Sequence, residues 1–312
     1  MPVYNDWAIG PGLIKLINDN LSGLDCKTDL LLVDDGSTLP LDFSTLNSNT
    51  VPSLNSFEAL ILGRNVGHQR AIAIGLAHIA ESRSYDAVIV MDSDGEDDPK
   101  DIPRLIAAFE EGNRGKLVFA KRTRRSEKLL FRTFYVFYRA LHKLLTGHTI
   151  SFGNFSIIPK HILSRAVLLS EIWNHYAAGI IKSRVPYTSI PTVRAKRLAG
   201  QSQMNFTSLV MHGLSSIAVH SDTIGVRALM LCAGLAALTV LGMMIILGVK
   251  LFTNLGIPGW ASTSMFALFI ILFQALTSSL IFSFMILQRR SGQEIIPKRD
   301  HKVFLLEVRK EF

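Results

Sequence analysis

Residues 85–111 read YDAVIVMDSDGEDDPKDIPRLIAAFEE, and their pattern is the strongest indication of fold class in the sequence. Its apolar start, Tyr85–Met91, has the length and β-branched content of a buried strand. A run of acids follows, and Pro99 then opens a segment with helical spacing that continues to Glu111. A strand, an acidic turn and a helix in this order indicate one unit of an α/β fold.

The same alternation repeats on both sides of this unit. Expected strands cover residues 29–33, 58–62 and 116–120, and an expected helix covers residues 67–81. Alternation at this spacing predicts βαβ units on a mostly parallel sheet. Ligands of such sheets bind at the carboxyl ends of the strands, so polar motifs that follow strands are the first candidates for a site.

The acidic turn after Met91 offers three alternate carboxylates. In an extended segment Asp92, Asp94 and Glu96 share one face, because alternate residues point to the same side. Three hard oxygen donors suit Mg²⁺ or Mn²⁺, with phosphate and water in the remaining positions. The alternative is a solvated acidic loop. The other acids are interpreted as residues that stabilise the next helix through its first turn: Asp97, Asp98 and Asp101.

Two further polar motifs follow expected strands. Residues 33–37 (VDDGS) place Asp35 where a carboxylate can bind a base or ribose, but the same residues also suit a helix cap and turn. Residues 64–69 (RNVGHQ) open the helix expected at 67–81. Their backbone N–H groups either meet a phosphate or simply cap the helix.

The chain changes character after Arg227. No charged residue follows until Lys250, and none follows that lysine until Arg289. Residues 228–249 and 264–287 each supply the ~20 uncharged residues that cross a bilayer core. A turn over residues 254–260 (NLGIPGW) separates them and ends in an interfacial tryptophan. We therefore expect a transmembrane hairpin.

Charge sets the expected orientation of this hairpin. Residues 251–261 carry no charge, whereas Arg227, Arg289 and Arg290 flank the other side, which places both chain ends in the cytoplasm. The net charge of +8 fits this bias together with affinity for anionic lipid, or attraction for a phosphorylated substrate. No recognition motif for nucleic acid accompanies the charge, so we expect no nucleic-acid partner.

Basic residues also concentrate before the hairpin. Residues 128–145 alternate aromatic and basic side chains, which fits an amphipathic helix either on the sheet or in the membrane interface. Residues 194–203 (RAKRLAGQSQ) bind anionic headgroups without specificity, or meet a lipid phosphate at the active site. The expected organisation is a catalytic domain over 1–204, a juxtamembrane amphipathic helix over 205–222, two transmembrane helices within 223–288 (about 227–250 and 263–288) and a cytoplasmic tail over 289–312.

Taken in order, these motifs resemble the family 2 glycosyltransferases, specifically the polyprenyl-phosphate sugar transferases similar to dolichyl-phosphate mannose synthase. The resemblance rests on these pieces: PVYN at 2–5, VDDGS at 33–37, GRNVG at 63–67 with AIAIGL after it, DSDGEDDP at 92–99, Arg122, the arginine-rich segment at 194–202 and the terminal hairpin. It implies a GT-A fold, in which Rossmann-like units bind a nucleotide sugar.

The resemblance also implies roles for individual residues. It places the nucleotide sugar against Pro2, Tyr4, Asn5, Asp35, Asn65, Gly67 and Asp92. It assigns Mg²⁺ or Mn²⁺ to Asp92, Asp94 and Glu96. It assigns catalysis to Asp94 and Arg122, and the lipid phosphate to Arg132, Arg194, Arg197 and Ser202.

Three features depart from the family pattern. The chain opens at Met1-Pro2, where relatives carry several apolar residues first, so we expect a shortened first strand. Gln203 stands where Lys or Arg is common, which removes one phosphate-binding charge, and Met204 replaces a frequent aromatic residue.

The implied activity is an inverting transfer of a sugar from a UDP- or GDP-linked donor to an undecaprenyl or dolichyl phosphate. The product would serve as a donor for glycan or cell-envelope modification, and the catalytic domain would stand on the cytoplasmic side of the inner (cell) membrane as part of a multi-pass protein. One alternative is a membrane glycosyltransferase acting on a glycan or another lipid, although the downstream Gln-x-x-Arg-Trp motif of processive relatives is absent. The other is a non-catalytic membrane partner. Self-association of the hairpin into a homo-oligomer is a further option.

Overall fold

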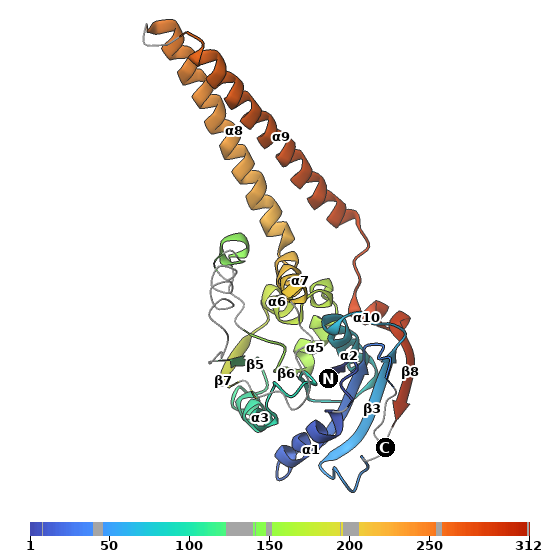
Figure 1. The fold of residues 1–312 in the computed structure, drawn as a ribbon. Coiled ribbons are helices and arrows are strands. Elements are labelled where there is room, and N and C mark those ends of the chain that lie inside the picture. Colours follow the sequence, from blue (N-terminus) through green and yellow to red (C-terminus); the bar gives the residue numbers. More distant parts are fainter. Residues whose placement is uncertain are drawn as a thin grey trace. The chain divides into compact units, whose positions relative to one another are not determined.

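The structure is a computed structural model that describes residues 1–7, 9–39, 46–122, 140, 142–147, 152–193, 195, 206–253, 258–310 and 312. The chain divides into two compact units (Figure 1). The first comprises Met1–Phe137, Thr149–Val219 and Glu294–Phe312, and the second comprises Tyr138–His148 and His220–Gln293. Each unit is described by itself.

Two four-stranded sheets form the centre of the first unit. The first has the order β1-β2-β3-β8, with β1 at Pro2–Val3, β2 at Thr28–Asp34, β3 at Leu54–Leu62 and β8 at Leu305–Lys310. The second has the order β4-β6-β5-β7, with β4 at Ala87–Val90, β5 at Leu117–Arg122, β6 at Ser156–Pro159 and β7 at Tyr187–Thr192.

Helices cover these sheets and connect their strands. The helices of the first unit are α1 at Gly10–Leu21, α2 at His68–Ser82, α3 at Ile102–Glu111, α5 at Lys160–Ala166, α6 at Tyr176–Lys182, α7 at Phe206–Ala218 and α10 at Pro297–Asp300. Short 3₁₀ turns are η1 at Pro99–Asp101, η2 at Ser170–Trp173 and η3 at His301–Phe304.

Alternating side chains of β2 pack into two separate hydrophobic cores. Leu31 and Val33 pack with α2, α5 and α6, whereas Leu30 and Leu32 pack with α1 and α3. Both cores also contain residues of β5 and β6, so the two sheets lie between the same helical layers. Helix α2 approaches β2 closely, because a Cβ on Gly75 would lie 2.7 Å from Cγ2 of Val33.

The α/β class is confirmed, but the strand pairing is more mixed than expected. β1–β2, β2–β3 and β5–β7 are parallel, whereas β3–β8, β4–β6 and β5–β6 are antiparallel. Strands β6 and β8 account for the difference. Neither was predicted from the sequence, and both insert beside strands that run the opposite way.

The segment expected to be a cytoplasmic tail, 289–312, contains this last strand. β8 pairs with β3 from Glu58↔Lys310 to Leu62↔Leu305 and so extends the first sheet. The ring of Phe312 packs edge-on against that of Phe57, with centroids 5.9 Å apart. The end of the chain is therefore structurally part of the first unit.

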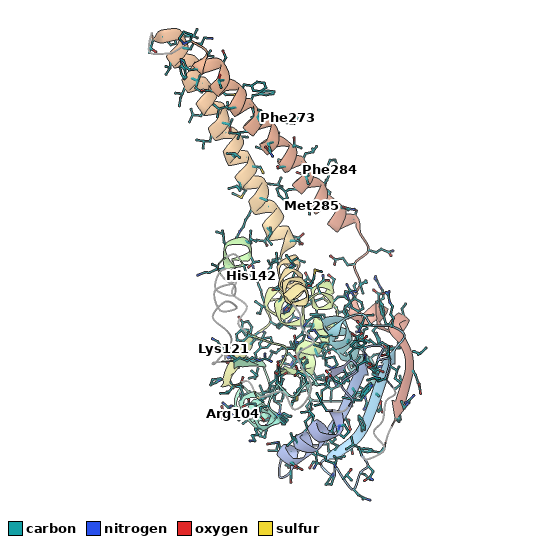
Figure 2. All side chains as sticks on the ribbon, in the orientation of Figure 1. Arg104, Lys121, His142, Phe273, Phe284 and Met285 are labelled. Atoms are coloured by element: carbon teal, nitrogen blue, oxygen red, sulfur yellow. The ribbon has the colours of Figure 1, made fainter. Side chains whose placement is uncertain are left out.

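Two long helices dominate the second unit (Figure 1). Helix α8 covers Ser221–Phe252 and α9 covers Trp260–Ser291. They pack antiparallel, since a Cβ on Gly225 would meet Ile286 at 2.8 Å and one on Gly242 would meet Leu268 at 3.3 Å. Both are long and apolar enough to cross a membrane by length and composition. The outer side chains are exposed, Phe273 and Phe284 among them (Figure 2).

Candidate active site

Asp35 joins two loops at the end of β2. Its carboxylate is buried and accepts hydrogen bonds from the backbone N–H groups of Val66 (2.7 Å) and Gly67 (2.9 Å). They are two of the N–H groups in residues 64–69, for which the sequence left a choice between a phosphate and helix capping, and both donate to Asp35. Burial raises the pKa of Asp35 to about 6, even though the two N–H groups favour its ionised form.

The turn after Asp35 fits against the same loop. Gly36 has φ +69°, and a Cβ there would lie 2.6 Å from the backbone of Arg64 and Asn65. Glycine is the residue that permits both this conformation and this approach. The N–H of Gly67, which donates to Asp35, also donates to the side-chain oxygen of Asn65 at 3.1 Å.

Asn5 holds the other side of this turn. Its side-chain oxygen accepts hydrogen bonds from the backbone N–H groups of Thr38 (2.9 Å) and Leu39 (3.2 Å). Pro2 lies in β1 and pairs with Val33. Tyr4 is 37% exposed and available to a ligand. The residues predicted to bind the nucleotide sugar at the start of the chain and around Asp35 and Asn65 therefore line adjoining turns.

The first residues of α2 connect this region to the second acidic motif. His68 Nε2 lies 2.8 Å from Nδ2 of Asn154 and 2.9 Å from Nε2 of Gln69. Amide N–H groups only donate, so His68 Nε2 accepts and the ring is neutral. Burial lowers the pKa of His68 to about 4, which agrees with a neutral ring. The ring also lies 3.9 Å from Oδ1 of Asp92.

Gln69 and Asn154 anchor that contact in the protein interior. Gln69 donates to Oδ1 of Asn154 (3.1 Å) and accepts from the backbone N–H of Tyr176 (2.6 Å). Asn154 in turn donates to Oδ1 of Asp92 over 3.4 Å. A polar network thus links α2, Asn154 two residues before β6, and Asp92 after β4.

Asp92 belongs to a second cluster with Asp97 and Arg122. The side chain of Asp97 is 3% exposed, accepts from the backbone N–H of Asp92 (3.1 Å) and forms a 3.0 Å ion pair with Arg122. Burial raises the pKa of Asp92 to about 6, and the charge of Asp94 adds to the effect. Burial and the charge of Asp92 likewise raise the pKa of Asp97 to about 6.

The donor set suits a divalent cation held jointly with a diphosphate. Asp92 and Asp94 interact electrostatically, so two hard carboxylates stand at one strand end. Among the described residues no three His, Cys, Asp or Glu side chains converge closely enough to hold a metal by themselves. Phosphate and water would have to supply the other ligands, and a role for Glu96 in metal binding stays a prediction.

The remaining predicted positions fall partly outside the residues that the structure describes. Arg132, Arg194, Arg197 and Ser202 fall outside the described residues, so their assignment to a lipid phosphate stays a prediction. Asp98 acts as predicted, because it caps η1 by accepting from the N–H of Lys100 at 3.0 Å. Asp97 does not behave like Asp98. It points to Arg122 and belongs to the site.

Sequence reasoning did not assign the side chains of Asp97, His68, Gln69 or Asn154 to the site, although His68 and Gln69 lie in the motif at 64–69. His68 and Asn154 are separated by 86 residues, so only the folded chain brings them together. Asp97 lies in the same acidic run, directly after Glu96, but its local sequence does not distinguish it from Asp98.

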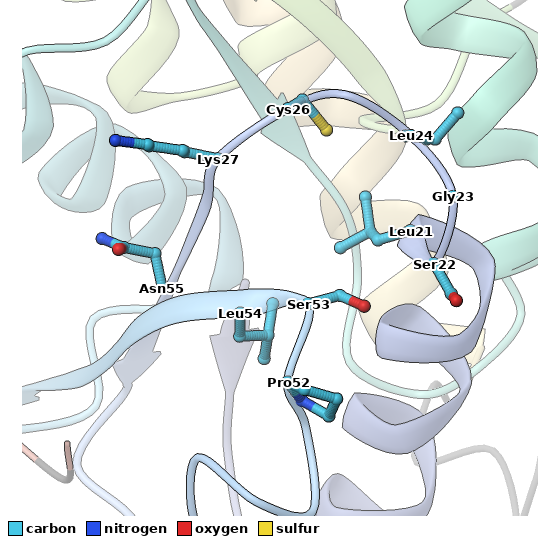
Figure 3. Close-up of a pocket in the computed structure, with 10 residues that line it drawn as sticks. All are labelled: Leu21, Ser22, Gly23, Leu24, Cys26, Lys27, Pro52, Ser53, Leu54 and Asn55. Atoms are coloured by element: carbon cyan, nitrogen blue, oxygen red, sulfur yellow. The ribbon is translucent and has the colours of Figure 1, made fainter.

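The structure also has an open hollow of about 500 Å³ at the opposite end of the first sheet (Figure 3). It is lined by residues that follow α1 and by the start of β3, including Lys27, Ser53 and Asn55. Asp35 follows the carboxyl end of β2, whereas the hollow adjoins the beginning of that strand. The hollow is therefore not part of the acidic site.

Comparisons with known proteins agree with this arrangement. A model of the family described as glycosyl transferase family 2 matches residues 1–166. The uncharacterized glycosyltransferase YkcC of Bacillus subtilis (strain 168) is 28% identical over 275 residues, which cover 84% of this chain and 80% of that protein.

Two solved structures are similar at a greater distance. Glucosyl-3-phosphoglycerate synthase from Mycobacterium tuberculosis, in complex with phosphoglyceric acid, has a TM-score of 0.49 at 17% identity and covers 72% of this chain and 78% of that chain. A mannosyltransferase from Pyrobaculum calidifontis, in complex with GDP-Man and Mn²⁺, has a TM-score of 0.41 at 16% identity and covers 89% and 85%. Neither likeness carries an argument about this chain.

The match to the family model spans more than half of the sequence and contains both acidic motifs. The first unit is accordingly a GT-A-like catalytic domain, and the enzyme transfers a sugar from a nucleotide-sugar donor. The chain belongs to glycosyl transferase family 2.

Proposed function

We propose that this enzyme transfers a sugar, with inversion, from a UDP- or GDP-linked donor to a polyprenyl phosphate at the cytoplasmic face of the inner (cell) membrane. The observation that carries the proposal is the combination of two features in one chain. The first is the cluster of Asp92, Asp97 and Arg122, which suits a charged, water-soluble donor. The second is the pair of apolar helices α8 and α9, which suits access to a lipid acceptor.

The donor would lie across the turns that follow β2 and β4. The N–H groups of Val66 and Gly67 fix the orientation of the Asp35 carboxylate. In this orientation the carboxylate would bind a ribose or base of the donor. Asp92 and Asp94 would hold Mg²⁺ or Mn²⁺, which neutralises charge on a diphosphate. Arg122 is 26% exposed and carries positive charge towards the same region.

The transfer itself needs little proton chemistry from the protein. An oxygen of the lipid phosphate attacks the anomeric carbon, the bond from that carbon to the diphosphate oxygen breaks, and the nucleoside diphosphate leaves with the electron pair. A phosphate monoester has a second pKa of about 6, so it is mostly ionised at neutral pH. Positioning and stabilisation of charge on the leaving group should therefore dominate, with Asp94 as the nearest candidate if a base is needed.

A labelling experiment with membranes tests this proposal. Membranes containing the full chain are incubated with polyprenyl phosphate, Mg²⁺ or Mn²⁺ and a panel of radiolabelled UDP- and GDP-sugars. We expect label in a lipid that mild acid cleaves, and only when the metal is present. Label in water-soluble glycan alone, or in a lipid that forms equally well without polyprenyl phosphate, would refute the proposed acceptor.

Two substitutions connect the product to the site. Asp92→Ala should lower the rate at least about 100-fold, because it removes a ligand of the metal ion that would stabilise charge on the leaving group. Asp98→Ala is the matched control, since Asp98 is an acid of the same loop that caps η1. The control should keep most of the rate. Equal activity of both variants would remove Asp92 from the mechanism.

A further inference from the structure

Gln274 is an amide at the midpoint of α9. The apolar part of this helix runs from Trp260 to Gln288, and Gln274 lies fourteen residues from each of these ends. At ~1.5 Å per residue it stands about 21 Å along the helix from either end. In a hairpin that crosses a bilayer this depth is the middle of the hydrocarbon core.

Gln274 lies on a side of α9 that is turned away from α8. The contacts of Leu268 with Gly242 and of Ile286 with Gly225 define the side of α9 that packs on α8. Gln274 follows Leu268 by six residues, which at ~100° per residue turns it well away from that side. It is exposed, and its neighbours on the same face, Ile270 and Ile281, are 49% and 54% exposed.

Two hydroxyl groups near Gln274 along α9 are bonded within their own helix. Thr277 donates to the carbonyl of Phe273 (2.8 Å), and Ser283 donates to that of Ser279 (2.9 Å). Within the part of the hairpin that the structure describes, 220–253 and 258–293, Gln274 forms no side-chain hydrogen bond. Hydrocarbon offers no water to an amide, so an exposed glutamine at this depth needs a partner from another molecule.

We infer that Gln274 joins two copies of this chain within the membrane. A second copy inserted in the same orientation presents its own Gln274 at the same depth. The amide both donates and accepts, so two of them form reciprocal hydrogen bonds across a two-fold axis. Alanine and isoleucine at positions 267, 270 and 281 flank the amide on this face and give the two helices an apolar contact around it. The inference rests on the membrane placement in the proposed function but not on the identity of the acceptor.

Energy transfer between labelled copies of the full chain measures this association. Cys26 is exposed and outside the hairpin, so it accepts a donor or acceptor dye once Cys232 is replaced by serine. Both labelled forms are reconstituted together in phosphatidylcholine–phosphatidylglycerol vesicles, and energy transfer is followed as lipid is added. We expect transfer well above that of randomly distributed copies, and association about tenfold weaker for Gln274→Leu.

Matched variants separate the amide from a general effect on the helix. Thr277→Val, which removes a hydroxyl that is already bonded within its own helix, should leave association unchanged. Gln274→Asn should retain part of it. Wild-type association in Gln274→Leu, or random energy transfer in the unmodified chain, would overturn the inference.

The same vesicles distinguish failure of this inference from failure of the proposed function. If alkaline carbonate releases the protein from membranes, the membrane placement and the inference both fall. If the protein resists extraction and associates through Gln274 but labels no polyprenyl phosphate, only the proposed acceptor fails.

Discussion

At the scale of single residues, the ion pair between Arg122 and Asp97 is unequal in exposure. The side chain of Asp97 is 3% exposed and that of Arg122 is 26% exposed. The acid is therefore held inside the protein, while part of the Arg122 side chain stays accessible to solvent. Arg122 serves the fold through Asp97 and, in the proposed mechanism, the reaction through its exposed edge.

Substitution of Arg122 should separate these two roles. Arg122→Ala leaves the buried Asp97 carboxylate without its counter-charge, and we expect a loss of about 3 kcal/mol in the free energy of unfolding. Arg122→Ala combined with Asp97→Asn should recover much of this stability, because the buried charge is gone. The rate of sugar transfer should stay low in both. Full recovery of the rate in the double variant would mean that Arg122 acts only on the fold.

The raised pKa of Asp35 should make the stability of the protein depend on pH. Its pKa is about 6 in the folded protein and 3.8 in an unperturbed chain. Its contribution to stability is therefore fully present below 3.8, where both states are protonated, and is lost as pH rises through 6. Asp35→Asn removes this titration and keeps an oxygen acceptor for the loop.

Thermal unfolding of both proteins in detergent checks this prediction. From about pH 4 to about pH 7, the Tm of the unsubstituted protein should fall relative to the Tm of Asp35→Asn. The comparison cancels other titrating groups, since both proteins share them. A difference that stays constant, or that shifts the other way, would contradict a raised pKa for Asp35.

Among the acids after β4, the sequence predicted some roles and not others. Asp92 and Asp94 were identified because an acidic run at the end of an apolar strand carries a clear pattern. Asp97 and Asp98 stand side by side in the same run, yet one faces Arg122 and the other caps η1. Nothing in the local pattern distinguishes them, because the difference depends on a partner 25 residues further along.

At the scale of elements, the turn after β2 must fit against the loop that opens α2. Gly36→Ala adds a methyl group 2.6 Å from the backbone of that loop, at φ +69°. We expect a loss of about 2 kcal/mol or more in the free energy of unfolding, together with weaker donor binding. Denaturant titration and donor binding by calorimetry measure the two effects.

Gly12→Ala is the control for this substitution. Gly12 lies in α1 with nothing near its added Cβ, so alanine there should be neutral or slightly stabilising. If Gly36→Ala behaved like Gly12→Ala, the two loops would not be packed as described.

Elements differed in how well the sequence predicted them. β2, β3 and α2 have long apolar patterns, and each was expected within a few residues of its observed bounds. β6 is a strand of four residues, and β8 follows a hairpin that separates it from the rest of its sheet. Such strands are stabilised by neighbours distant in sequence, so local periodicity does not reveal them.

At the scale of the whole molecule, the chain leaves the catalytic unit, forms the helical hairpin and then returns. The hairpin was predicted from composition alone, since two long uncharged runs need no knowledge of tertiary contacts. The return was not predicted. Residues 294–312 belong to the first unit, so two connections join the hairpin to the enzyme.

In the reaction that we propose, the acceptor is the phosphate of a polyprenyl monophosphate. The most direct test gives the purified full chain one nucleotide-sugar donor and compares polyprenyl phosphate with the matched polyprenol, which lacks only the phosphate. We predict a sugar–lipid product and equimolar nucleoside diphosphate with the monophosphate alone, and neither with Asp92→Ala. Equal turnover of the free polyprenol, or product formation that does not require either polyprenyl lipid, would contradict a polyprenyl phosphate acceptor.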